Sequence, residues 1–214
     1  MDTEPQKYSQ LNQHRLAHIN RVLRGIRNVN QLIVAEDDPL RLIERACATM
    51  TETMGYQNAW IALLDAEGQA IVATAAAVKT GGFTALQRRL AAGEYPDCMK
   101  QALAHDGVVV TLNPQSTCGD CPAAAEYAGC ARLTRRLQHG DKTHGVLAVA
   151  TSAAYAHDVE EQTLFNEMAG DLAFALHKIE AAQQLHASQM MLARTERITH
   201  SGSWEWDIAT DRVR

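Results

Sequence analysis

Apolar residues near the start of the chain recur at intervals of three and four, the spacing that lines up side chains along one side of an α-helix. This pattern predicts one long helix over residues 8–35. Its apolar seam consists of Leu16, Ile19, Leu23, Ile26, Asn30 and Ile33. Asn30 is the polar member, and a polar residue at such a position helps to fix the register of paired helices. The seam therefore favours a helix that pairs with another helix.

Two further helices are predicted from their capping residues. Asp38 suits an N-cap and Pro39 a first helical position, so a second helix is expected from there to about Met54. Asp158 is a suitable N-cap for a last helix that continues to about Thr199. The apolar stripe of this last helix is formed by Leu164, Met168, Leu172, Ala175, Ile179 and Leu185.

The length of the last helix predicts an oligomer. A helix of about 40 residues spans roughly 60 Å, which is more than a core of this size can cover. Its outer part needs a partner, and the same helix of a second copy is the simplest one. We therefore expect a parallel homodimer formed through the N- and C-terminal helices.

Between these helices the pattern changes to short apolar runs that are typical of strands. Residues 59–64 and 70–75 flank the turn at residues 65–68 and predict one hairpin. Residues 131–138 and 144–151 predict a second one. The intervening segments are expected as a short helix, a helix capped by Asp97 and a short strand, over residues 86–91, 97–105 and 108–112. This order predicts the α+β class, with one mostly antiparallel sheet flanked by helices.

Composition excludes some classes of partner. The formal net charge of -5 over 214 residues argues against nucleic acid or an anionic membrane as a constitutive partner. The start of the sequence lacks the pattern of a signal peptide, and no run reaches the roughly 18 apolar residues of a membrane-spanning helix. We therefore expect a cytoplasmic protein.

The cysteines are the main candidates for chemistry. Four of the five, Cys98, Cys118, Cys121 and Cys130, are clustered in the sequence, and the middle pair forms a Cys-x-x-Cys unit. Cys47 lies in a helical pattern and is expected to be a buried apolar residue. In a reducing compartment, clustered thiols are more often metal ligands or redox groups than structural disulfides.

Three interpretations of the cysteine cluster remain open. Four thiolates could bind zinc at about 2.3 Å or hold an iron–sulfur cluster. The Cys-x-x-Cys pair could instead close a disulfide as a thiol switch, although Asp120 between the two would oppose thiolate formation. The third interpretation is that the thiols are small buried residues in an irregular loop. Candidates for lining a ligand pocket are Trp60, Tyr95, Tyr127 and His144.

The order of elements and several segments resemble a GAF domain over roughly residues 38 to 180. The segments are 58–65, 136–140, 144–149 and the helix at 160–176. The chain is similar to GAF domains of bacterial sensor histidine kinases and diguanylate cyclases. Several of these carry a cysteine before the third strand and a Cys-Pro loop after it, positions that Cys98 and Cys121–Pro122 would occupy here.

The resemblance implies a small-ligand pocket between the sheet and the intervening helices, and no catalytic step. The Asn-Lys-Phe-Asp-Glu motif of cyclic-nucleotide-binding members is missing, and no cysteine is followed by the histidine of bilin-attaching members. Both ligands are therefore unexpected. Residues 197–207 resemble the opening of a PAS domain. The expected organisation is an N-terminal signalling helix, a GAF-like domain, a C-terminal signalling helix and the start of a PAS domain, over residues 1–37, 38–157, 158–199 and 200–214.

The expected function is that of a sensory domain in a signal-transduction protein. It would relay ligand, metal or redox state through dimeric helices to downstream PAS and output domains in the same chain. Two alternatives remain: a cysteine-dependent enzyme resembling methionine sulfoxide reductases built on the same fold, and a purely structural dimerisation module.

Overall fold

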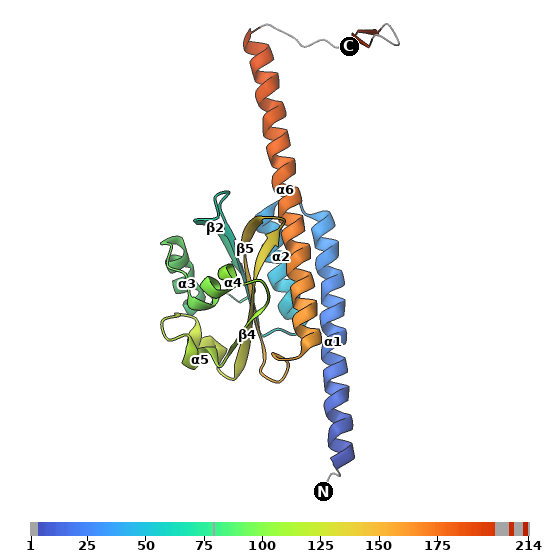
Figure 1. Ribbon diagram of the computed structural model, residues 1–214, viewed down its shortest axis with the longest axis vertical. Helices are drawn as coiled ribbons and strands as arrows, with labels where there is room; N and C mark the ends of the chain where they lie inside the picture. Colours follow the sequence, from blue (N-terminus) through green and yellow to red (C-terminus); the bar gives the residue numbers. More distant parts are fainter. Residues whose placement is uncertain (1–3, 79, 200–205, 208–211, 214) are drawn as a thin grey trace. The chain divides into compact units, whose positions relative to one another are not determined.

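The computed structural model describes the backbone of residues 4–78, 80–199, 206–207 and 212–213, and the side chains of residues 13–78 and 80–195. One sheet of five antiparallel strands, in the order β2-β1-β5-β4-β3, is the centre of the fold (Figure 1). The strands are β1 (Asn58–Leu64), β2 (Ile71–Ala76), β3 (Val109–Leu112), β4 (Cys130–His139) and β5 (Lys142–Ser152). The predicted α+β class with an antiparallel sheet is confirmed.

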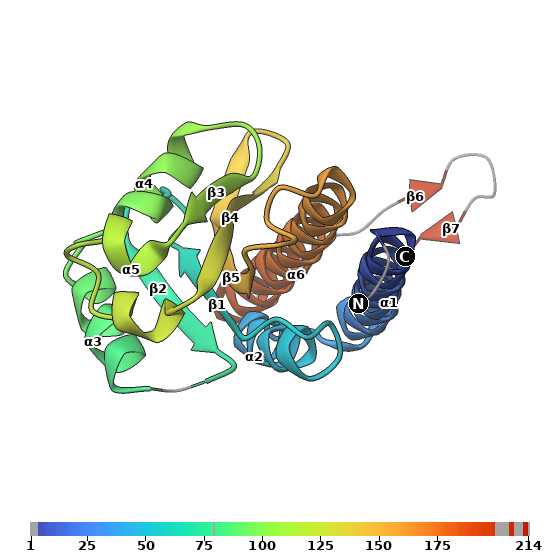
Figure 2. The same ribbon diagram turned by 90° about the horizontal axis from the view of Figure 1, so that it is seen from below.

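Helices cover both faces of the sheet (Figure 2). One face carries α2 (Pro39–Glu52) and the first part of α6 (Val159–Thr199), and α1 (Glu4–Ala35) packs outside them, against α2. The other face carries α3 (Gly81–Ala91), α4 (Asp97–Ala104), α5 (Pro114–Thr117) and the 3₁₀ helix η1 (Ala124–Tyr127). The sheet therefore separates the long helices from the short ones.

The predicted caps of two helices are confirmed. Asp38 adopts an extended conformation before α2 and accepts a hydrogen bond from the Arg41 amide at 2.8 Å, while Pro39 takes the first helical position. Asp158 accepts a hydrogen bond from the Glu160 amide at 3.0 Å at the start of α6. In both places a short carboxylate satisfies an amide that the helix itself leaves without an acceptor.

Two helices on the other face differ from the prediction. Helix α3 begins at Gly81, because Thr80 is its N-cap and accepts from the Phe83 amide at 3.1 Å. The prediction placed this helix only over residues 86–91. Helix α4 has Pro96 at its N-cap position, and Asp97 is the first helical residue rather than the cap. Proline has no side-chain acceptor, so this end has no side-chain cap.

Side chains of the central strands alternate between the two faces. The short helices cover an apolar cluster that includes Trp60 and Ala62 of β1 and Val146, Ala148 and Ala150 of β5. The residues that alternate with these along the strands, such as Ile61 and Leu147, are also fully buried and face the long helices. The apolar core is thus continuous through the sheet, and both faces must be covered for it to form.

Helix α1 buries only part of the predicted seam, together with residues that lie beside it. Ile19, Val22 and Val29 are buried, and Gly25 allows α1 to approach Met54 closely. Leu16 and Leu23 are 59% and 46% exposed. Periodicity alone located the helix, but it could not decide which of two adjacent apolar stripes would pack against the domain.

Polar contacts join the middle of α1 to the beginning of α6. The imidazole Nε2 of His18 lies 2.9 Å from Oε2 of Glu161, and the two side chains are almost fully buried. His18 also stacks on Tyr155 with a centroid distance of 4.0 Å. Arg15 forms an ion pair with Asp158. These contacts, here called the α1–α6 clip, hold the two long helices together where α6 begins.

Residues 178–214 form a second unit, which contains the remainder of α6. In it, the two-residue strands β6 (Trp206–Asp207) and β7 (Arg212–Val213) pair antiparallel. The predicted PAS opening falls largely on residues 200–205 and 208–211, outside the described part. Among the described residues, none of the helices combines the length and the hydropathy that crossing a membrane requires.

Candidate functional site

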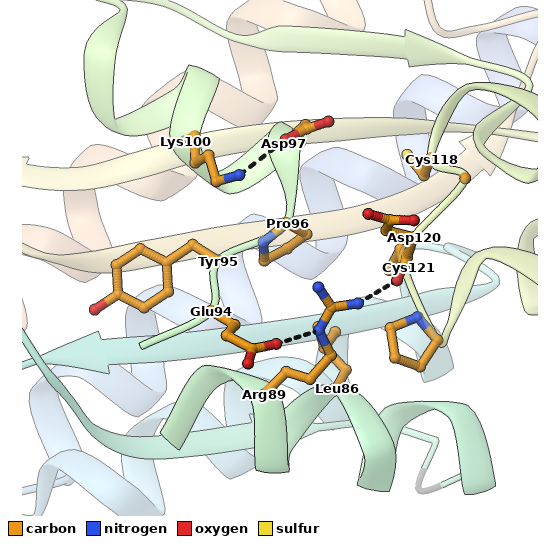
Figure 3. Close-up of a pocket in the computed structure, with 12 residues that line it drawn as sticks. Leu86, Arg89, Glu94, Tyr95, Pro96, Asp97, Lys100, Cys118, Asp120 and Cys121 are labelled. Carbon is orange, nitrogen blue, oxygen red and sulfur yellow. Dashed lines mark hydrogen bonds and ion pairs between the residues drawn. The ribbon is translucent and has the colours of Figure 1, made fainter. Parts of the chain in front are cut away.

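A pocket of about 200 Å³ opens between α3, α4 and the turn that contains the Cys-x-x-Cys unit (Figure 3). Leu86, Tyr95 and Pro96 give it an apolar side. Five charged residues also line it: Arg89, Glu94, Asp97, Lys100 and Asp120. Its volume suits a small metabolite, since pockets for larger organic ligands measure about 300–1,000 Å³.

The Cys-x-x-Cys turn is held against α3 by polar contacts. Arg89 donates one hydrogen bond to the backbone oxygen of Asp120 and another to Glu94, the latter at 3.0 Å (Figure 3). Glu126 of η1 accepts from the Gly82 amide at 3.1 Å, so it adds a negative charge at the N-terminus of α3. A Cβ on Gly82 would collide with Glu126 and with the backbone of Pro122. The second glycine of the pair therefore permits this close packing.

The structure brings three of the four clustered cysteines together. Cys118 and Cys121 line the pocket and are joined by a turn in which the Cys121 amide donates to the Cys118 oxygen at 3.0 Å. Cys98 is buried in the first turn of α4. Burial raises the pKa of the Cys98 thiol, and Cys118 and Cys121 lie near enough to contribute to that rise, whereas Arg132 opposes it.

The fourth cysteine points elsewhere. The thiol of Cys130 contacts the side-chain oxygen of Gln57 and lies 3.5 Å from the Ala128 oxygen. Across the described side chains, no three His, Cys, Asp or Glu residues are arranged to hold a metal ion, and all five thiols are free. A four-thiolate site would require this segment to rearrange, so metal binding stays a prediction from the sequence. Cys47 is fully buried, as expected.

Arg132, the residue at the centre of this region, was not among the residues predicted from the sequence. It lies on β4 and is 0% exposed. Its Cζ atom stacks over the Tyr127 ring, 3.9 Å from the centroid, and its Nη1 donates to the Cys98 thiol at 3.1 Å. Arginine is seldom fully buried without a paired carboxylate. The sequence signal was an arginine inside a strand whose neighbours are apolar, at residues 130–134.

The surroundings of Arg132 keep it charged. Burial alone would lower the pKa of its guanidinium, but Tyr127, Cys98 and Cys121 outweigh burial and raise that pKa. Burial in turn raises the pKa of the Tyr127 phenol, against the opposing effect of Arg132. Tyr127 and Cys98 are therefore neutral at pH 7, while the guanidinium is positive.

The predicted pocket residues fall into separate places. Tyr95 lines the pocket, and its hydroxyl donates to the Gln69 oxygen at 2.7 Å. Tyr127 and Trp60 are buried in the apolar cluster behind the pocket. The Trp60 indole lies near the Tyr127 hydroxyl and tends to lower its pKa. These two aromatic residues form the inner wall next to Arg132.

His144 lies away from the pocket. Leu137 pairs with Gly145 and Gln138 with Thr143, so the register of β4 and β5 shifts at His144, which lies at a β-bulge. Such a bulge changes the direction of a side chain. The His144 ring accordingly packs edge-on against His177 of α6, with a centroid distance of 5.7 Å. This histidine contacts the long-helix side of the fold.

Comparison with known families agrees with this architecture. The family model of the GAF domain matches residues 36–177, so the chain belongs to the GAF domain family. Among curated proteins, none has a sequence that matches this chain.

Solved structures show the same fold at low sequence identity. A free methionine-R-sulfoxide reductase from Neisseria meningitidis, solved with its substrate, has 16% identity and a TM-score of 0.57, covering 75% of this chain and 91% of its own. The GAF domain of a protein described as a sensor histidine kinase from Pseudomonas syringae pv. tomato has 17% identity and a TM-score of 0.55, covering 85% and 99%. A bacteriophytochrome from R. palustris has 12% identity and a TM-score of 0.56, covering 85% and 42%.

Proposed function

We propose that this GAF domain is a sensory module that relays the state of its pocket through paired long helices to a downstream output domain. The observation that carries the proposal is the apolar stripe left exposed on α1. Leu16 and Leu23 are one heptad apart, and Asn30 follows one heptad later. A stripe with this spacing is suited to pairing with the same helix of a second copy. The proposed assembly is a parallel homodimer.

The last helix supports the same assembly. Beyond residue 180 the described side chains of α6 are all exposed, including the large apolar ones Leu185, Met190, Met191 and Leu192. A long helix without a packed apolar face gains little stability by itself. In the proposed dimer these residues pack against their counterparts.

The clip between α1 and α6 supplies the proposed route for the signal. The pocket lies on one face of the sheet and the long helices on the other, and His18 and Glu161 join those helices through a buried contact. A change on the pocket face that shifts β4 or β5 would be passed to α6 and, through the clip, to α1. The downstream domain would respond to the altered pairing of these helices.

Light scattering tests the dimer over a range of protein concentrations. We expect a dimer at micromolar concentration, converted to a monomer by the double substitution Leu16→Glu and Leu23→Glu. Leu40→Glu is the matched control, because Leu40 is similarly exposed at 44% but lies on α2, outside the stripe. A monomeric wild-type protein, or equal dissociation of the control, would contradict the proposal.

A second candidate function is a reductase of sulfoxide substrates. The likeness to the reductase from Neisseria meningitidis and the grouping of Cys98, Cys118 and Cys121 favour it. Turnover of free methionine sulfoxide with a dithiol reductant, lost on replacement of these cysteines by serine, would establish an enzyme. The sensory proposal expects no turnover.

The predicted metal site has its own test. Protein purified without chelator and without air is analysed for zinc, iron and sulfide. About one zinc per chain, lost when Cys118 and Cys121 become serine, would establish a metal site made by rearrangement of the loop. Absence of metal with reversibly oxidised thiols would favour the thiol switch instead.

A further inference from the structure

Arg132 carries a buried positive charge that the described residues do not neutralise. Its side chain is fully buried, and none of the ion pairs among the described side chains includes it. Its immediate partners are the Tyr127 ring and the Cys98 thiol. Both are neutral at pH 7, because burial raises the pKa of each group. A buried charge without a counter-charge is strongly unfavourable in a folded protein.

The geometry of the guanidinium indicates what is missing. Nη1 donates to the Cys98 thiol, whereas Nε and Nη2 have no acceptor among the described residues. Nε and Nη2 project from the same edge of the planar group. Two parallel N–H donors on one edge match the two oxygens of a carboxylate, which accepts them in a bidentate pair. The unused donors of Arg132 thus form one complete carboxylate-binding edge.

The remaining surroundings favour a singly charged ligand. One guanidinium beside neutral groups is balanced by one negative charge, which a carboxylate supplies at pH 7. A dianion such as phosphate would leave a negative charge buried among Tyr127, Cys98 and Cys121. Thr134 lies two residues along β4 on the same face as Arg132, and its hydroxyl is also buried without a hydrogen-bond partner in the described part of the chain. It offers one further polar contact.

The pocket provides an approach to Arg132 from solvent. Cys121 lines the pocket and also lies near enough to Arg132 to affect the pKa of the guanidinium. The Cys-x-x-Cys turn is therefore placed between the pocket and the guanidinium. Displacement of this turn would connect the two, and one of the contacts that hold it on α3 is the exposed hydrogen bond from Arg89 to the Asp120 oxygen.

We propose that Arg132 binds the carboxylate of a small molecule through Nε and Nη2, with the rest of that molecule directed toward the pocket. The role of this ligand as the sensed signal rests on the function proposed above, whereas the binding itself does not. Cys98 is then a positioning residue, because it holds Nη1 and leaves the opposite edge for the ligand.

Acetate is the probe, since it carries the proposed group and little else. Thermal unfolding is followed with increasing sodium acetate, and with acetamide and sodium chloride at the same concentrations. We expect a saturable rise in melting temperature with acetate alone, because a ligand that binds only the folded state stabilises it. An equal rise with acetamide or chloride, or no rise at all, would overturn the proposal.

Two variants test whether the effect of acetate depends on the Nε and Nη2 donors of Arg132. Arg132→Lys keeps the charge but removes the bidentate edge, so the acetate response should be lost. Arg135→Lys is the matched control on the same strand, because Arg135 already donates to Asn166 and Gly107. A response that survives in Arg132→Lys would contradict the assignment.

Arginine side-chain NMR on the wild-type protein decides the matter even if Arg132→Lys fails to fold. The Nε–Hε signal of Arg132, identified by the shielding from the Tyr127 ring, should move saturably with acetate and stay unchanged with acetamide. An unmoved signal refutes the site. A monomeric protein that binds acetate would refute the proposed relay and leave this site standing, so the two failures are distinguishable.

Discussion

At the residue scale, the fold depends on glycines at points of close backbone approach, and Gly145 is the sharpest case. A Cβ at this position would lie less than 3.0 Å from the backbone oxygen of Ala62 on the neighbouring strand. Backbone cannot move aside as a flexible side chain can. Gly145→Ala is therefore expected to lower the free energy of unfolding by about 2 kcal/mol or more, measured by urea denaturation. Gly170→Ala is the control, because a Cβ there meets nothing within 4 Å. Equal stability of the two variants would contradict this packing.

Some residues of the candidate site could be predicted from the sequence and others could not. Cys98, Cys118 and Cys121 were selected from spacing, and they do meet. Sequence spacing could not show that Cys130 lies apart from the other three cysteines. Its thiol contacts Gln57, which is distant in the sequence. Nor could spacing single out Arg132, because a strand arginine is normally solvent-exposed and only the assembled fold encloses this one. His144 was expected near the pocket, but the bulge in β5 is set by cross-strand register, which a single strand sequence does not specify.

At the scale of elements, the buried pair between His18 and Glu161 is expected to stabilise the packing of α1 against α6. His18→Ala leaves the Glu161 carboxylate buried without this partner, and such a loss costs about 2 kcal/mol. Urea denaturation measures it, with His14→Ala as the control because His14 is exposed on the same helix. Loss of stability in the control alone, or in neither variant, would show that the pair does not hold the helices.

The ion pair between Arg15 and Asp158 gives the clip a dependence on pH. The hydrogen bond from Arg15 holds the pKa of Asp158 below its ordinary value. A carboxyl whose pKa is lower in the folded state adds stability above its unfolded value of about 4, and that contribution is lost as the pH falls through the folded pKa. Asp158→Asn keeps an N-cap and removes the charge. Its stability deficit should be present at pH 7 and vanish in acid, as followed by denaturation at several pH values. A deficit that is independent of pH would contradict the contribution of the ion pair.

Element boundaries could be predicted where a cap or a turn announces them, as at Asp38, Pro39 and Asp158. They could not be predicted where the deciding partner is distant in sequence. Thr80 caps helix α3 locally, but the support that Glu126 gives to its first turn at Gly82 comes from 44 residues away. The apolar seam of α1 was located on the helix, but its division into a buried and an exposed stripe depends on how Met54, just after α2, packs against Gly25.

At the scale of the whole molecule, the proposed function couples a pocket on one face of the sheet to the pairing of helices on the other. Each half can be disturbed separately. Loss of the carboxylate site through Arg132→Lys should leave the helices paired, and loss of the exposed stripe on α1 should leave the carboxylate site intact. Only the connection between the halves makes the domain a sensor rather than a dimerisation module with a ligand.

The most direct test of that connection is the distance between the two copies of α1 in solution. Leu23→Cys places a spin label on the exposed stripe, while the five native thiols are buried. Pulsed electron–electron double resonance then measures the label-to-label distance with sodium acetate and with sodium chloride. The account predicts a defined distance between labels that changes with acetate and stays constant in the Arg132→Lys background. A distribution that acetate leaves unchanged would contradict the relay, even in a dimer that binds acetate.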